Sequence, residues 1–203
     1  MARIAEARTP AAPGSRSQAA RREKILEVAA ELGATADFDR VQMLDVAKNA
    51  GVAIGTLYRY FPSKTQLFAG VFEAQIVHFA HREWTREDAD PVTAVGENLV
   101  RLNRQLLRTP LLCSSMLRAT AGNYMADAPD NPSWLGAEAA LPQAIWNTLG
   151  NPVPDEQDHS AIRLLVYSWW GVLVSTLSGW VPGTRADEDM RVATRLILAR
   201  YAR

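Results

Sequence analysis

A short run near the front of the chain carries most of the groups that could recognise another molecule. Hydroxyl and guanidinium groups donate hydrogen bonds to base edges and phosphates, threonine methyls and small apolar groups contact thymine methyls, and small residues let a backbone approach closely. Lys64 also follows an expected helix start, where free backbone N–H groups attract a phosphate. The run therefore indicates recognition of double-stranded DNA. Its residues are Ala53, Gly55, Thr56, Tyr58, Arg59, Tyr60 and Lys64.

The spacing of small and apolar residues predicts the helix pair that would present this run. Ala47 is a small residue where two helices could cross, and Gly51, four residues later, tolerates the positive φ of a sharp turn. Val46, Val52 and Leu57 would fill the space between the helices. An ordinary helical hairpin has similar spacing, but the polar groups on a short third helix favour a helix-turn-helix. Packing is the alternative interpretation of Tyr58 and Tyr60, and one of the two could lie partly in the core.

Hydrophobic periodicity predicts an all-α protein of about nine helices. Residues 1–16 have no hydrophobic period and are expected to be a disordered tail. We expect residues 17–64 to form a three-helix DNA-binding domain and residues 65–203 a helical domain for ligand binding and dimerisation. The expected helices lie at about 17–33, 41–49, 53–60, 63–84, 92–108, 110–120, 134–149, 156–180 and 186–202.

Composition excludes several classes of protein. The 203 residues carry 22 basic and 22 acidic side chains, but residues 1–64 have a net charge of +3 and the remainder −3, which fits one DNA-facing surface on an acidic body. The first 13 residues lack the apolar core of a signal peptide, and no stretch approaches the roughly 18 apolar residues of a membrane span. The single cysteine, Cys113, cannot form an internal disulfide. We therefore expect a cytoplasmic protein.

Residues that could catalyse a reaction or bind a metal are few. His78 and His81 are three apart on an expected helix, with Glu83 nearby, but a zinc site needs about four ligands and the chain has no second cysteine. Cys113 lies in an apolar helix without a nearby histidine, so we expect it to pack in the core or line a cavity. We predict no enzyme activity, no metal and no cofactor.

The second half of the chain is rich in tryptophan, since all six tryptophans lie beyond residue 80. Core packing explains at least half of them, and the others, with nearby methionines and aromatics, could line an apolar cavity for a small molecule. The residues expected to line it are Phe79, Met116, Tyr124, Trp134, Trp146, Trp169 and Trp170.

Two apolar stripes at helical spacing lie near the end of the chain. One runs from Ile162 to Trp180 and the other from Val192 to Ala199. Some of this surface could be buried within one subunit. The remainder could pair with a second copy, and a dimer would let two helix-turn-helix units address a palindrome.

The segment Gly55-Thr-Leu-Tyr-Arg-Tyr-Phe-Pro-Ser-Lys64, preceded by Val46-Ala-Lys-Asn-Ala-Gly-Val52, resembles the DNA-binding domain of TetR-family transcriptional regulators. The resemblance covers about residues 18–72. It implies that the third helix is the recognition helix, that the body binds an effector, and that the helices at 156–180 and 186–202 pair with their copies in a four-helix bundle. It adds Gln42 and Met43 to the expected DNA contacts. Ile54 replaces a frequently polar residue at the head of the recognition helix, and we expect it to alter base preference.

Shorter stretches resemble the actinobacterial repressors of sterol catabolism, which respond to sterol-derived acyl-CoA thioesters. The stretches are Leu102-Asn-Arg104, Arg108-Thr-Pro-Leu-Leu112 and Met116-Leu-Arg-Ala119. This resemblance implies a steroid or acyl-CoA effector and adds Leu102 to the cavity. It also suggests arginines that could face CoA phosphates, although surface solvation explains them equally well. These arginines are Arg101, Arg104, Arg108 and Arg118.

The predicted function is a ligand-responsive regulator, a repressor that binds a palindromic operator as a dimer and is released by a hydrophobic small molecule. The alternative is a helical carrier of hydrophobic ligands with no role in DNA regulation. Salt-dependent binding to duplex DNA separates the two, since a carrier would bind ligand alone.

Overall fold

The computed structural model describes residues 16–86, 90–150 except 127–138, and 153–202, with side chains 123–126 also outside the description. Across these residues the chain is helical, which confirms the predicted all-α class. The helices are α1 (Arg16–Thr35), α2 (Met43–Asn49), α3 (Ile54–Tyr60), α4 (Lys64–His78), α5 (Pro91–Leu106), α6 (Pro110–Ala126), α7 (Ala140–Leu149), α8 (Glu156–Leu177) and α9 (Gly183–Ile197). A π-helical turn at Phe79–Glu83 continues α4, and a 3₁₀ turn at Ala199–Tyr201 follows α9.

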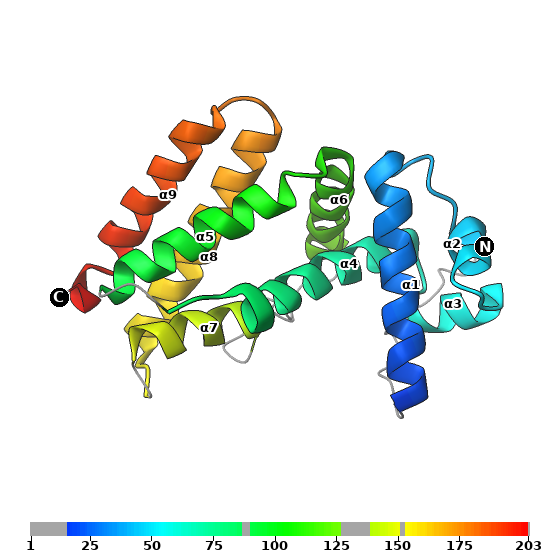
Figure 1. Ribbon diagram of the computed structural model, residues 1–203, viewed down its shortest axis with the longest axis horizontal. Helices are drawn as coiled ribbons and strands as arrows, with labels where there is room; N and C mark the ends of the chain where they lie inside the picture. Colours follow the sequence, from blue (N-terminus) through cyan, green and yellow to red (C-terminus); the bar gives the residue numbers. More distant parts are fainter. Residues whose placement is uncertain (1–15, 87–89, 127–138, 151–152, 203) are drawn as a thin grey trace, which may run out of the picture.

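Two groups of helices are joined through α4 and α6. Figure 1 shows α1, α2 and α3 together on the right, and α5, α7, α8 and α9 together on the left, with α4 and α6 between them. Helix α4 starts beside the first group and runs into the second. Helix α4 contacts α1 of the first group and α7 of the second, so it links the two groups.

The helix-turn-helix forms as its spacing predicts. Gly51 has a φ of +67°, a conformation that favours glycine, and the backbone N–H of Val52 donates to the carbonyl of Ala47 at 3.0 Å. The side chains of Val46 and Leu57 are fully buried between α2 and α3. Two short helices are thus held rigidly against each other.

We expected the first helix to end at Gly33, but α1 continues to Thr35. A Cβ at Gly33 would lie 2.7 Å from Cε1 of Phe68 and 2.9 Å from Cδ1 of Leu112. Since real Cβ atoms do not approach that closely, glycine at this position lets α4 and α6 pack directly on α1. Its role is close packing.

Ser63 and Gln66 have the spacing of a capping box at the start of α4, and one half of that box forms. Oγ of Ser63 accepts a hydrogen bond from the backbone N–H of Gln66 at 3.1 Å. The reciprocal bond is missing, since Oε1 of Gln66 is buried without a partner among the described residues. Ser63 alone therefore provides the side-chain cap.

Other boundaries differ from the predicted ones by several residues. Helix α6 extends to Ala126, six residues beyond the expected end, and α7 is described only from Ala140, since residues 134–138 of the expected helix lie outside the description. Helix α8 ends at Leu177, close to Gly179, whose φ of +74° turns the chain toward α9.

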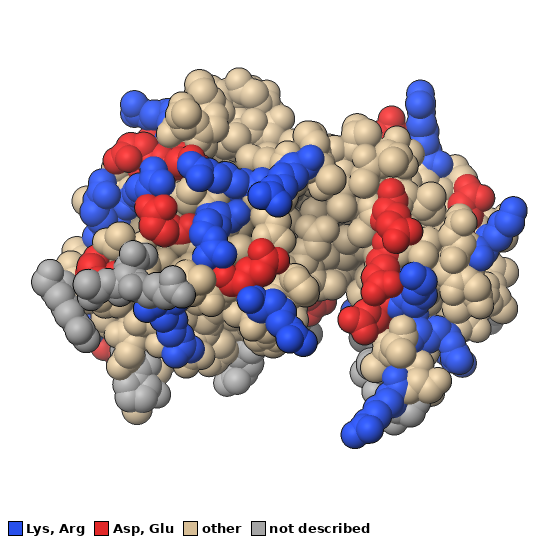
Figure 2. Space-filling model, viewed as in Figure 1, with Lys and Arg blue, Asp and Glu red and all other residues tan. Residues whose placement is uncertain are grey.

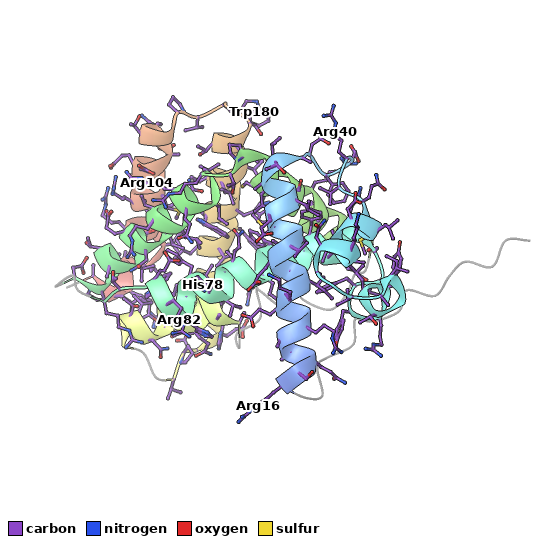
Figure 3. All side chains as sticks on the ribbon, turned by 45° about the vertical axis from the view of Figure 1, so that its right-hand side comes forward. Arg16, Arg40, His78, Arg82, Arg104 and Trp180 are labelled. Carbon is purple, nitrogen blue, oxygen red and sulfur yellow. The ribbon has the colours of Figure 1, made fainter. Side chains whose placement is uncertain are left out.

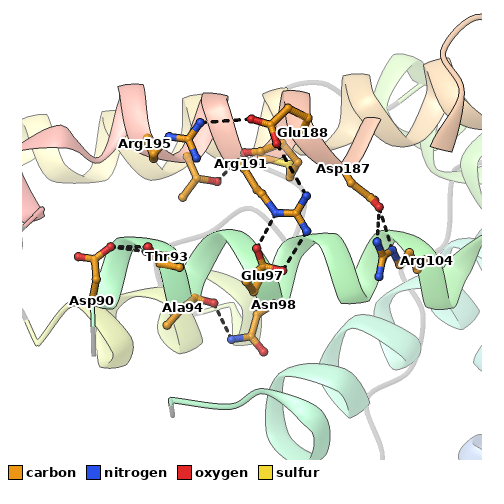
Figure 4. Close-up of polar contacts among 12 residues, drawn as sticks. Asp90, Thr93, Ala94, Glu97, Asn98, Arg104, Asp187, Glu188, Arg191 and Arg195 are labelled. Carbon is orange, nitrogen blue, oxygen red and sulfur yellow. Dashed lines mark hydrogen bonds and ion pairs between the residues drawn. The ribbon is translucent and has the colours of Figure 1, made fainter. Parts of the chain in front are cut away.

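The body is fastened by ion pairs between α5 and α9 (Figure 4). Nε of Arg191 lies 2.6 Å from Oε1 of Glu97, and this hydrogen bond lowers the pKa of the Glu97 carboxyl. Arg104, farther along α5 than Glu97, pairs with Asp187 of α9. At the other end, Asp155 and Asp158 form a capping box at the start of α8.

Helix α8 has an uncovered apolar side. In length and composition it is the one helix of the described residues that could cross a membrane, and 28% of its most apolar window is buried. Core helices meet the same criterion, so one such helix is weak support for a membrane segment. Its packing against α9 and its carboxylate-capped start identify it as a packed helix with one face exposed.

Candidate DNA-binding surface and effector domain

One side of α3 packs in the core and the other faces outward. Leu57 and Tyr60 are buried, with Tyr60 only 2% exposed. Ile54 is 38% and Tyr58 47% exposed, and Arg59 is exposed as well, with its guanidinium 5.5 Å from the centre of the Tyr60 ring. The outward side therefore offers an apolar side chain, a phenol and a cation together.

The remaining predicted DNA contacts divide by exposure. Gln42, just before α2, and Ala53, just before α3, are exposed, whereas Thr56 is half-buried. Met43 is half-buried and packs against the core, so its side chain is directed partly inward. Tyr60, which we expected to offer its hydroxyl to DNA, is instead a core residue because it packs on the inner side of α3.

Sequence reasoning overlooked Leu44, which is 65% exposed in the first turn of α2. Helical periodicity could have identified it: Leu44 lies two residues before the buried Val46, a spacing that places it on the opposite side of α2, next to Asp45.

Lys64 has partners within the protein. Its Nζ donates to the backbone carbonyls of Asp39 at 3.3 Å and Val41 at 3.0 Å, and lies 4.7 Å from the centre of the Phe38 ring. These contacts come from the loop before α2. The ammonium that we expected to face a phosphate therefore also fixes the entrance to the helix-turn-helix.

Arg118 reaches the same loop from α6. Its Nη1 lies 2.8 Å from Oδ2 of Asp39, and its guanidinium lies 4.7 Å from the Phe38 ring centre. The hydrogen bond lowers the pKa of Asp39 and raises that of Arg118. We use the name interdomain clamp for this group of contacts, which is formed by Phe38, Asp39, Lys64 and Arg118. It joins α6 and α4 to the helix-turn-helix.

The other arginines considered for CoA phosphates are mostly engaged. Arg104 pairs with Asp187 in Figure 4, and Arg101 donates to Oγ1 of Thr85 at 3.1 Å. Arg108 is exposed, and its side chain makes no hydrogen bond or ion pair with the described residues. Over α5 and α9, Figure 2 shows basic and acidic groups interleaved, a pattern of ion pairing. A continuous cationic patch for CoA is not apparent on that face.

The apolar residues predicted for an effector site share one continuous core. Phe79, Leu102, Met116, Trp146 and Trp169 are buried in it, and Trp170 packs against it. Tyr124 and Trp134 lie outside the described side chains.

Phe72 organises part of this core. It stacks on Trp169 at 6.2 Å and meets Trp170 edge-on at 5.6 Å. The aromatic cluster therefore spans α4 and α8, so the helix that runs into the body is packed directly against the tryptophans.

Several polar atoms of the helical body are buried without hydrogen-bond partners among the described residues. They include Oδ1 of Asn103, Oγ of Ser115 and Nε1 of Trp169. A buried unpaired polar group costs about 1–3 kcal/mol, and native proteins contain few of them. The Asn103 oxygen is an acceptor and the Trp169 N–H is a donor, and a polar group of a bound molecule could satisfy either one.

Groups suited to catalysis are sparse. Burial raises the pKa of the Cys113 thiol to about 12, which suits a core residue and not a nucleophile. Among the described residues no group of three or more potential metal ligands occurs. Glu83 lies 3.6 Å from Nε2 of His78 and accepts a hydrogen bond from Gln105. His78 and the nearby Arg82 lie away from the helix-turn-helix (Figure 3).

A helix-turn-helix joined to a helical body defines a class of DNA-binding regulators. Residues 25–71 match the family described as bacterial regulatory proteins of the tetR family, and residues 88–197 match the tetracyclin repressor-like C-terminal domain. This chain belongs to the TetR family.

Similar proteins include transcriptional repressors. The chain is 30% identical to the HTH-type transcriptional repressor KstR of Mycobacterium tuberculosis, over 91% of this chain and 84% of that protein. It is 42% identical to a TetR transcriptional regulator from Rhodococcus sp. RHA1, whose crystal structure matches with a TM-score of 0.81 over 90% of this chain and 98% of that one. Thermus thermophilus FadR, solved in complex with lauroyl-CoA, is 18% identical with a TM-score of 0.57, covering 87% and 93% of the two chains, and shows the fold alone. The named regulators are not enzymes.

Proposed function

We propose that this protein is a dimeric repressor that binds a palindromic operator through α3 and is released by a hydrophobic small molecule. The observation that carries the proposal is the outward side of α3, where Ile54, Tyr58 and Arg59 are exposed on a helix whose other side is fixed in the core. A rigid short helix with exposed side chains is what entry into a major groove requires.

The dimer is supported by the uncovered side of α8 and α9. Leu164 is 57%, Tyr167 46% and Leu196 73% exposed. Gly171 lies in the middle of α8, and a Cβ there would meet no atom within 4 Å. Alanine is a better helix former by about 1 kcal/mol, so the subunit alone gives no reason for a glycine. A helix of the second copy packed closely on α8 would give one.

The effector is supported by the polar atoms buried in the body. Asn103 offers an acceptor and Trp169 a donor within apolar surroundings, so a ligand with a large apolar skeleton and one or two neutral polar groups fits them. A steroid or the acyl part of an acyl-CoA thioester has this chemistry. The lauroyl-CoA bound by FadR belongs to the second class.

Release would follow from a population shift. The free dimer holds its recognition helices about 34–36 Å apart, which matches successive major grooves. Because Phe72 of α4 packs on the tryptophans, a ligand between them would displace α4, and the interdomain clamp would carry that displacement to the loop before α2. A coupling of about 1–3 kcal/mol changes operator affinity about 5–150-fold.

Operator binding tests the proposal. Duplexes selected from a randomised pool should bind the full chain with an affinity that falls as salt rises. In a plot of the logarithm of the affinity against the logarithm of the salt concentration, each neutralised phosphate should contribute about −0.9 to the slope. Tyr58→Ala and Arg59→Ala should each weaken binding about 5–150-fold, the loss expected for a base-reading contact. Arg82→Ala is the matched control, since Arg82 is an exposed arginine of the body.

The opposite result would favour a carrier. If no duplex is enriched, while the protein binds a steroid or lauroyl-CoA, the regulatory function is wrong. If Arg82→Ala weakens operator binding as much as Arg59→Ala, the placement of the reading surface on α3 is wrong.

A further inference from the structure

Gly55 has no structural reason to be a glycine. It lies in the first turn of α3 with an ordinary helical conformation, and a Cβ there would meet no protein atom within 4 Å. Gly70 is different, since a Cβ at that position would lie 2.9 Å from Cε1 of Phe61. Because alanine is the better helix former, the fold of the subunit alone does not account for the missing side chain at Gly55.

Two exposed side chains flank that bare stretch of backbone. Ile54 is 38% exposed and Tyr58, one helical turn later, is 47% exposed, so both lie on the same outward side. Ile54 has no hydrogen-bonding group, and it can therefore recognise a partner only by apolar contact. In the major groove the apolar group that distinguishes one base from the others is the C5-methyl of thymine.

We infer that Ile54 reads thymine methyl groups in each operator half-site, with Gly55 bringing the backbone of α3 close enough for the contact. The inference rests on the proposed function and adds the base chemistry to it. Ile54 thus determines specificity, whereas Arg59 supplies a charge that can reach a phosphate or a guanine. Operators that this protein binds tightly contain a thymine at the same place in both half-sites.

Replacing thymine by uracil tests the contact directly, because uracil lacks the methyl but keeps the base pair and the phosphates. Duplexes selected from a randomised pool by the full chain are resynthesised with uracil at one symmetric pair of positions at a time. At one symmetric pair of positions the affinity should fall about 15-fold, because two buried thymine methyls are lost, one in each half-site, and each contributes about fourfold. At the other pairs the affinity should change little.

A variant assigns the effect to Ile54. Ile54→Ser should bind the thymine and uracil duplexes equally, because the side chain that senses the methyl has gone. Val77→Ser is the matched control: Val77 is 36% exposed on α4, outside the helix-turn-helix, and this variant should keep the full uracil effect.

Gly55→Ala supplies an independent measurement. The added methyl meets no atom of the protein, so the thermal midpoint should be unchanged or slightly raised, while operator affinity should fall at least tenfold. A loss of binding without a loss of stability separates a contact with DNA from a role in folding.

The outcomes separate the inference from the function beneath it. If a duplex is selected and bound but uracil is tolerated at every position, or if Ile54→Ser retains the uracil effect, thymine reading by Ile54 is wrong and the repressor function stands. If Gly55→Ala binds as the unchanged chain does, close approach at Gly55 is wrong. If no duplex is enriched, both the function and the inference fail.

Discussion

Lys64 and Cys113 show how neighbours decide what a side chain can do. The ammonium of Lys64 faces two backbone carbonyls and an aromatic ring, so much of its hydrogen-bonding capacity is used inside the protein. The thiol of Cys113 is surrounded by apolar groups, which disfavour its charged form. Neither property can be read from the residue type.

The buried thiol gives a prediction on reactivity and pH. Burial raises the pKa of Cys113 from 9.0 to about 12, so the stability gained from a neutral buried thiol is present below pH 9 and is lost as pH rises from 9 toward 12. At pH 8 we expect iodoacetamide to leave the native protein unlabelled and to label it fully in denaturant. Mass spectrometry measures this, and rapid labelling of the native chain would contradict it.

At the scale of elements, the interdomain clamp connects helices that are far apart in sequence. Arg118 on α6 holds Asp39, 79 residues earlier, and Lys64 at the start of α4 holds the same loop. The Arg118–Asp39 pair is exposed, so it contributes little to global stability. Its effect is to restrict the loop that leads into α2.

Removing one side of the clamp should loosen that loop without unfolding the protein. Arg118→Ala should increase amide hydrogen exchange a few-fold in residues 36–42, with little change in the thermal midpoint. Because the hydrogen bond lowers the pKa of Asp39, the pair persists above the ordinary titration range of an aspartate and is lost as pH falls through the lowered pKa.

Arg82→Ala controls for the loss of a positive charge. Unchanged exchange in residues 36–42 of Arg118→Ala would show that Lys64 holds the loop alone.

Periodicity predicted most of these elements, and tertiary contacts account for what it missed. The spacing of Ala47, Gly51 and Leu57 predicted the helix-turn-helix, because that packing is local. Gly33 was read as a helix end, since its reason lies in Phe68 and Leu112, far along the chain. The inward side of Tyr60 and the clamp likewise depend on how helices meet.

At the scale of the whole molecule, the uncovered sides of α8 and α9 leave apolar surface exposed on a single subunit. Leu164 and Leu196 together place two large apolar side chains in solvent. Burying them against a second copy would stabilise the pair by removing apolar surface from water. A single helix-turn-helix makes few contacts with DNA, so the dimer would also set the affinity for a palindrome.

Breaking this surface should produce monomers. Leu164→Glu would bury an unpaired carboxylate in the interface, which costs several kcal/mol, so we expect sedimentation to shift to a monomer at micromolar concentration and operator affinity to fall at least 100-fold. Val77→Glu places the same charge on α4 and should leave the dimer intact. This face would be excluded as the interface if the unchanged chain sediments as a monomer, or if Leu164→Glu still sediments as a dimer.

The missing side chain at Gly33 has a mechanical consequence. It brings α1, α4 and α6 together at one point, with Phe68 and Leu112 nearer than any larger residue would permit. Sliding the helices past such a point forces atoms into contact, whereas tilting them about it does not. If α4 tilts when a ligand binds, the contact at Gly33 would be the point about which it turns, and the displacement at the outer side of α3 would grow with its distance from that point.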